Sequence, residues 1–150
     1  REVAKRARAF GMKVVACDPF VKECAEADEI LQEMGDALGK ADYISIHTPL
    51  TEETKGIINK DVIGRLKKGV IIVNTGRGKV VVEEDLAAAL EAGHVGAYAT
   101  DVWYSDPPDP SCPLLKAKNV LMTPHIGASS RENLLRIGDC IVEIISSFGT

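Results

Sequence analysis

The chain has 150 residues and a formal net charge of -4, with 45% hydrophobic and 27% charged residues. These values are typical of a globular protein that is large enough for one hydrophobic core. The negative charge disfavours a general affinity for nucleic acid or for acidic membranes. No apolar run approaches the roughly 20 residues that span a bilayer, and no signal-peptide pattern opens the sequence. We therefore expect neither nucleic acid nor a membrane among its partners.

The cysteines give no sign of a metal site. They are Cys17, Cys24, Cys112 and Cys140. No two of them form a CxxC pair, and none stands close to a histidine in the sequence, whereas zinc sites usually show such spacing. Cys17 and Cys140 are expected to be small, buried, apolar residues. This cysteine usage fits a reducing, cytoplasmic compartment.

Helical and extended patterns alternate along the chain. The first is a helix over residues 1–10, in which Val3, Ala7 and Phe10 share one face and Gly11 follows as a cap. Apolar runs that predict strands cover residues 13–17, 43–46, 70–74, 96–102 and 119–123. Each run is apolar at successive positions, which indicates parallel strands covered on both faces.

Further helices are expected over residues 59–66, 83–92 and 129–148. Asn59 and Ser129 are suitable N-terminal caps, and Gly69 and Gly93 are suitable stop signals for the first two helices. The last helix has apolar residues at helical spacing: Leu134, Ile137, Ile141, Ile144 and Phe148. The alternation predicts an α/β fold with a doubly wound parallel sheet, and the Pro-rich segment 105–113 is expected to be a stiff loop.

Polar or small residues follow every predicted strand. They are Asp18, His47-Thr48, Thr75-Gly76-Arg77, Asp101 and the segment 123–127. Ligands of doubly wound sheets bind beyond the carboxyl ends of the strands. Five separate parts of the sequence should therefore converge on one crevice.

Asp18 is a candidate for binding the ribose of a dinucleotide. An acid at this strand end accepts hydrogen bonds from ribose hydroxyls and repels the extra phosphate of NADP. The alternative is a turn-forming Asp before Pro19. The segment "GRGKVV" over 76–81 begins G-x-G, but Val81 stands where a dinucleotide fingerprint has its third glycine. We expect that fingerprint just before Arg1, so that this chain is part of a longer one and lacks the first strand and the Gly-rich loop.

Several segments resemble the NAD-dependent D-2-hydroxyacid dehydrogenases. They read "DP" at 18–19, "HTPLTEETKGIIN" over 47–59, "VNTGRG" over 73–78, "TDVW" over 100–103 and "TPHIGAS" over 123–129. The branch that they resemble most is that of the D-3-phosphoglycerate dehydrogenases of serine biosynthesis, followed by the glyoxylate/hydroxypyruvate reductases. The resemblance implies that residues 1–150 are part of a Rossmann-type NAD-binding domain, with the substrate domain outside this chain.

The family reaction moves a hydride between NAD and C2 of a D-2-hydroxy acid. His125 matches the family's acid/base histidine, a residue type whose pKa lies near working pH. Arg77 matches the arginine that binds the substrate carboxylate or carbonyl through paired hydrogen bonds. Gly76 and Gly78 are expected to let the backbone approach the cofactor closely. The alternatives are a structural histidine after Pro124 and a surface salt bridge of Arg77.

Asp106 stands where the family has a glutamate paired with the histidine. Its side chain is one methylene shorter, so we expect the contact to need a small backbone adjustment or a water. A carboxylate there still favours the imidazolium form. The alternative is that Asp106 only opens the Pro-rich turn.

The resemblance further implies that NAD is bound by a set of strand-end residues. The set is Asp18, Thr48, Thr75, Gly76, Arg77, Asp101, His125, Gly127 and Ala128. Asp101 would accept a hydrogen bond from the nicotinamide amide, whereas Thr48 and Ala128 could equally be packing residues. No metal is expected.

Two further expectations concern the whole protein. The alternative function is an NAD(H)-sensing scaffold similar to the corepressors of the C-terminal-binding type, which share this fold and its Arg, acid and His residues. The family usually forms homodimers or homotetramers. Without the first strand, sheet edges would lack partners, so residues 1–150 alone are expected to be poorly stable and inactive.

Overall fold

The structure, a computed structural model, describes residues 1–148 apart from the side chain of Asp36. These residues form two compact units. The first consists of Arg1–Ala41 and Arg65–Lys67, and the second of Asp42–Gly64 and the chain from Lys68 onward.

The first unit contains a short parallel sheet. Helix α1 (Glu2–Ala9) precedes strands β1 (Val15–Cys17) and β2 (Glu29–Leu31), and a 3-10 helix, η1 (Gly35–Lys40), follows them. Gly11 ends α1 with a φ of 75°, as the sequence predicts. However, α1 buries none of its side chains. Strand β2 was not predicted, because a three-residue "EIL" segment shows no apolar run.

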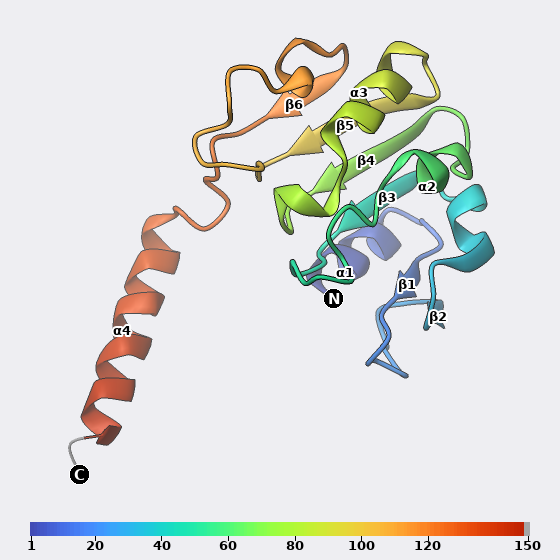
Figure 1. Ribbon diagram of the computed structural model, residues 1–150. Coiled ribbons are helices and arrows are strands. Elements are labelled where there is room, and N and C mark those ends of the chain that lie inside the picture. The colour runs from blue at the N-terminus through green and yellow to red at the C-terminus, as the bar shows by residue number, and fades with distance from the viewer. Residues whose placement is uncertain (149–150) are drawn as a thin grey trace. The chain divides into compact units, whose positions relative to one another are not determined.

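The second unit is built on four parallel strands in the order β3-β4-β5-β6 (Figure 1). They span Tyr43–Ile46, Val70–Asn74, Val95–Thr100 and Val120–Met122. The connections contain helices α2 (Lys60–Gly64) and α3 (Glu83–Glu91) and 3-10 helices η2 (Gly78–Val80) and η3 (Pro113–Lys116), and helix α4 (Arg131–Phe148) comes last. The predicted parallel α/β architecture is confirmed.

The core of the second unit lies on one face of this sheet. Val70 and Ile72 of β4 are buried there together with Leu86 of α3 and Leu114 of η3. Along β4, buried and partly exposed residues alternate strictly, and Leu121 of β6 is 70% exposed. Helix α3 packs on β5 and η3. Within this unit the opposite face of the sheet is more open.

The helix ends of the second unit partly follow the prediction. Asn59 caps α2, because its Oδ1 accepts hydrogen bonds from the backbone N–H of Asp61 and Val62, both at 3.1 Å. The cap of α4 is Ser130 rather than Ser129, since the Ser130 Oγ accepts the N–H of Asn133 at 3.2 Å.

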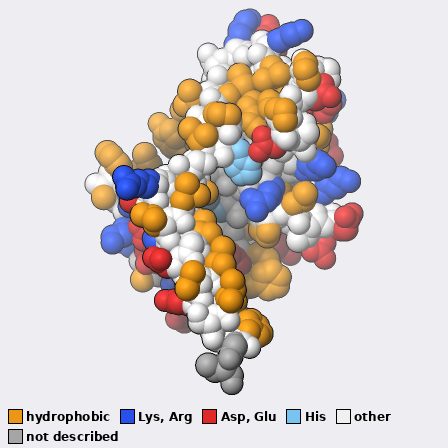
Figure 2. All heavy atoms as spheres, turned by 90° about the vertical axis from the view of Figure 1, so that its left-hand side faces the viewer, with side chains coloured by type: hydrophobic (Ala, Val, Ile, Leu, Met, Phe, Trp, Pro, Cys, Tyr) orange, Lys and Arg blue, Asp and Glu red, His pale blue; other side chains and the backbone are white. Residues whose placement is uncertain are grey.

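Helix α4 carries the predicted apolar stripe but buries none of its side chains (Figure 2). Cys140 on this helix is exposed, and so is Cys17 at the end of β1. Both were expected to be buried, and the cysteine that is buried is Cys112. Of the helices in the part of the chain that the structure describes, none is long and apolar enough to cross a membrane.

Candidate active site

Four of the five predicted strand ends belong to the sheet of the second unit. His47 follows β3, Thr75 follows β4, Asp101 follows β5 and Thr123 follows β6. Because these strands are parallel neighbours, their carboxyl ends lie along the same edge of the sheet. Asp18 follows β1 in the first unit, where its Oδ1 accepts the backbone N–H of Phe20 at 2.8 Å. This contact is the turn that the sequence offered as an alternative.

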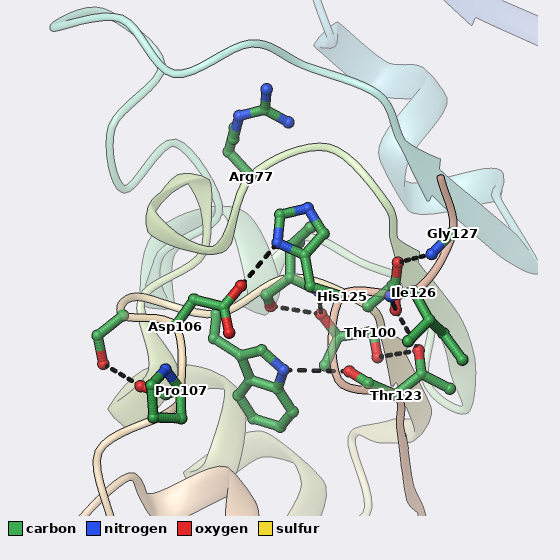
Figure 3. Close-up of polar contacts among 12 residues, drawn as sticks. Arg77, Thr100, Asp106, Pro107, Thr123, His125, Ile126 and Gly127 are labelled. Carbon is green, nitrogen blue, oxygen red and sulfur yellow. Dashed lines mark hydrogen bonds and ion pairs between the residues drawn. The ribbon is translucent and has the colours of Figure 1, made fainter. Parts of the chain in front are cut away.

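The loop that carries Arg77 is shaped by a buried amide. Asn74 is 0% exposed. Its Oδ1 accepts the N–H of Gly76, and its Nδ2 donates to the carbonyl of Arg77, both at 3.0 Å. The Arg77 side chain is exposed and donates to the carbonyl of Gly76 at 2.7 Å. It makes no hydrogen bond to another described side chain, and Figure 3 shows it apart from the contact between His125 and Asp106.

The two glycines of this loop lie against the chain's own backbone. A Cβ on Gly76 would be 2.8 Å from the carbonyl oxygen of Thr48, and a Cβ on Gly78 would be 2.1 Å from the carbonyl carbon of Trp103. Both distances are shorter than those that real Cβ atoms show. We expected these glycines to make room for a cofactor, but their first requirement is to let segments of the protein pack together.

His125 and Asp106 are in direct contact. The His125 Nδ1 lies 3.0 Å from the Asp106 Oδ2, and the two side chains are 49% and 61% exposed (Figure 3). The shorter acid therefore reaches the imidazole without an intervening water. His125 itself has a φ of 55°, in the left-handed region.

Asp101 accepts three hydrogen bonds from the segment around His125. Its Oδ1 accepts the hydroxyl of Thr123 at 2.6 Å and the N–H of Ile126 at 2.8 Å, and its Oδ2 accepts the N–H of Gly127 at 2.7 Å. Burial opposes ionisation of this carboxyl. The hydrogen bonds from Thr123, Ile126 and Gly127 and the charge of His125 outweigh burial and lower the pKa of Asp101.

The remaining predicted residues have simpler surroundings. The Thr75 Oγ1 lies 3.4 Å from the His47 Nδ1, and the carbonyl of Ala128 accepts the side-chain amide of Asn133 at 2.9 Å. Thr48 is half-buried, with its backbone against Gly76. His94, which we expected to be solvated, is half-buried, and its Nε2 lies 2.9 Å from the carbonyl of Ile63.

Sequence reasoning assigned no role to Asn74 or Trp103 and gave Thr123 only a place at a strand end, although all three shape this site. The Trp103 Nε1 donates to the carbonyl of Thr123 at 3.2 Å. A signal was available for Asn74, because an amide at the end of a fully apolar strand must find hydrogen-bond partners if it is buried. The partners of Thr123 and Trp103 lie 20 or more residues away in the sequence, and no local pattern indicates them.

Residues 1–127 match the family described as D-isomer specific 2-hydroxyacid dehydrogenase, NAD binding domain. The chain belongs to this family. Over 146 residues it is 48% identical to a D-3-phosphoglycerate dehydrogenase of Archaeoglobus fulgidus, a match that covers 96% of this chain and 28% of the relative. Over 147 residues it is 45% identical to a hydroxypyruvate reductase of Thermotoga maritima, covering 97% of this chain and 48% of the relative.

Solved structures agree with this assignment. An NAD-dependent formate dehydrogenase from Staphylococcus aureus in complex with NAD superposes with a TM-score of 0.87 at 33% identity, covering 99% of this chain and 44% of that one. The chain thus spans about a quarter to a half of the length of the relatives that it matches.

The Asp101 carboxylate at the end of β5 is the group that would hold an NAD nicotinamide in this 2-hydroxyacid dehydrogenase domain. A carboxylate oxygen accepts about two hydrogen bonds, and the Asp101 Oδ2 accepts only one from the described residues. It is therefore available to a carboxamide N–H. Among residues 1–148, no group of three or more His, Cys, Asp or Glu side chains could hold a metal ion.

Proposed function

We propose that this chain is part of an NAD-dependent oxidoreductase that transfers a hydride between NAD and C2 of a D-2-hydroxy acid. The observation that carries the proposal is the direct contact of His125 with Asp106 beside the Arg77 loop, at the carboxyl edge of the sheet. The relatives named above suggest D-3-phosphoglycerate, or a substrate of the hydroxypyruvate or glyoxylate type. The substrate domain is proposed to lie outside this chain.

The contact of His125 with Asp106 determines which imidazole nitrogen faces the substrate. An ionised carboxylate only accepts hydrogen bonds, so the Nδ1 of His125 carries the proton that lies toward Asp106. The Nε2 is left to give a proton to the C2 oxygen of a 2-oxo acid, or to take one from a 2-hydroxy acid. The negative charge of Asp106 stabilises the imidazolium that donates this proton.

Arg77 supplies the charge that binds the acid group of the substrate. Its guanidinium is exposed, and it donates only to the carbonyl of Gly76 among the described residues. Most of its donors are therefore available to a carboxylate, which it can bind through two parallel hydrogen bonds. NAD, when bound, would supply the hydride acceptor or donor for C2, and the Asp101 carboxylate would hold its carboxamide.

The test is turnover by the full-length protein. We expect oxidation of NADH with hydroxypyruvate, glyoxylate or 3-phosphohydroxypyruvate, and reduction of NAD with D-glycerate or D-3-phosphoglycerate. H125Q should lower kcat by about 10²- to 10⁴-fold, the usual contribution of a general acid or base. H94Q is the matched control and should keep its activity, because the carbonyl of Ile63 is the one hydrogen-bond partner of the His94 side chain among the described residues.

Two results would contradict the proposal. One is unchanged turnover in H125Q. The other is NADH binding without turnover of any of these substrates, which would favour the NAD(H)-sensing scaffold.

The proposal extends to three properties of the whole protein. If D-3-phosphoglycerate, which the names of two relatives contain, is the best substrate, we propose that the enzyme acts in serine biosynthesis and that it is cytoplasmic. We also propose a homodimer or homotetramer. The exposed apolar stripe of α4 and the open face of the sheet are surfaces that further chain could cover. Sedimentation equilibrium of the full-length protein tests the oligomeric state.

A further inference from the structure

The backbone at His125 is in a conformation that needs support. Its φ of 55° lies in the left-handed region, and only Asn119 shares this property among the other non-glycine residues described. Such a conformation costs free energy, so it persists only where the surroundings hold it. Neighbouring groups must therefore hold the turn that carries the imidazole.

The Asp101 carboxylate makes the contacts that hold this turn. It accepts the hydroxyl of Thr123, which precedes His125, at 2.6 Å. It also accepts the backbone N–H groups of Ile126 and Gly127, which follow His125, at 2.8 and 2.7 Å (Figure 3). Three donors within five consecutive residues thus converge on one side chain. The carboxylate closes the turn on both sides of the histidine, while the imidazole itself is left to contact Asp106.

We propose that Asp101 and Thr123 are positioning residues that hold the His125 turn in its catalytic conformation. This inference rests on the proposed function, because it assumes that His125 transfers the proton. Asp101 therefore has a second role beside the nicotinamide contact. Its Oδ1 and one acceptor position of its Oδ2 hold the turn, and the other position of Oδ2 is left for the carboxamide of a bound cofactor.

The geometry specifies a carboxylate rather than an amide. In D101N the NH₂ group would have to lie against the N–H of Ile126 or that of Gly127, whichever way the amide is turned. Two donors would then face each other. Gly127 adds a steric requirement, because a Cβ there would lie 2.8 Å from the Asp101 Oδ2.

Thr123 allows this role to be tested without altering the nicotinamide contact. Its hydroxyl donates to the Asp101 Oδ1, away from the acceptor position on Oδ2 that is left for the cofactor. T123V removes the hydroxyl and keeps the shape of the side chain, while T123S keeps the hydroxyl. The experiment measures kcat, the dissociation constant of NADH, the solvent isotope effect on kcat and the melting temperature of the full-length enzyme.

We expect T123V to lower kcat by about tenfold or more, because a small displacement of a catalytic group has effects of this size. The solvent isotope effect should rise as proton transfer becomes slower, the dissociation constant of NADH should stay unchanged, and T123S should restore kcat. D101N should lower kcat further and weaken NADH binding as well.

The outcomes separate this proposal from the proposed function. If T123V turns over like the wild type while H125Q is inactive, the positioning role is wrong and the proposed function stands. Equal losses of kcat in T123V and T123S would also overturn the role, as would a T123V variant whose only defect is a lower melting temperature. If H125Q is fully active, the proposed function itself fails.

Discussion

The two glycines of the Arg77 loop, together with Gly64 at the end of α2 as a reference, provide a graded test of how closely the backbone packs around the site. An added Cβ would meet nothing within 4 Å at Gly64, the Thr48 carbonyl oxygen at 2.8 Å at Gly76, and the Trp103 carbonyl carbon at 2.1 Å at Gly78. None of these three glycines has a φ in the left-handed region. Substitution by alanine therefore tests the available space and not the backbone conformation.

The expected loss in the free energy of unfolding increases with the steric overlap of the added Cβ. Ordinary contact begins at 3.4 Å, so the Cβ of G78A would lie more than 1 Å too close to two backbone atoms of Trp103. These atoms cannot rotate away, and we expect a loss of roughly 3 kcal/mol in the free energy of unfolding, the upper end of the usual cost of overpacking. G76A should lose roughly 1–2 kcal/mol for its smaller overlap. G64A should change stability by less than about 0.5 kcal/mol.

Urea unfolding of the full-length variants measures these values, and kcat/KM adds a second readout. Trp103 is three residues from Asp106, so displacing its backbone should also move the acid that contacts His125. We expect kcat/KM of G78A to fall at least about tenfold, with G64A unchanged. If G78A is as stable and as active as G64A, the tight backbone contact at this loop does not exist and the reasoning is refuted.

Two other predictions concern acids. D106N should lower kcat about 10- to 100-fold by removing the charge that stabilises the His125 imidazolium. D109N is its control on the same loop, and equal kcat values in steady-state assays would contradict the role of Asp106. Burial raises the pKa of Glu83, and the hydrogen bond from Cys112 only partly offsets this effect. Because the folded-state pKa is raised, the contribution of Glu83 to stability is fully present below the unfolded pKa and is lost as the pH rises through the folded value. Urea unfolding from pH 4 to 8 should show this loss in the wild type and in E84Q but not in E83Q. If the free energy of unfolding depends on pH in the same way in all three proteins, the prediction is wrong.

The sequence predicted the larger sheet well because its strands carry a strong local signal. The runs over 43–46 and 70–74 are apolar and end at polar residues, and both strands lie at the predicted bounds. Strand β2 was missed because it is a strand through its pairing with β1 rather than through its composition. The predicted helix over 59–66 ends early, at Gly64, in front of a turn that includes Arg65.

Apolar patterns predict that a face is to be covered, but they do not say by what. The stripe of α4 has the predicted spacing, yet Leu134 is 60% and Phe148 87% exposed. Phe10 at the end of α1 is 84% exposed in the same way. Burial depends on a partner element, and none of the described residues supplies one for these faces. This is also why the predicted burial of Cys140 was wrong.

The contact of Asp106 with His125 shows most clearly what local reasoning cannot supply. From side-chain length alone, an aspartate in place of glutamate should leave a gap, yet the observed distance is 3.0 Å. Whether a side chain reaches its partner depends on the position of its Cα, which the conformation of the loop determines. Contacts with residues far away in the sequence stabilise the conformation of this loop. The Tyr104 hydroxyl donates to the carbonyl of Val81 at 2.8 Å, from 23 residues further along the chain.

Glu83, a buried acid in the first turn of α3, lies beside the same loop. It lines one cavity together with Tyr104 and Cys112, which flank the segment that contains Asp106. A motif in the sequence indicates which acid stands near His125, whereas the path of the whole loop decides whether its side chain reaches the imidazole.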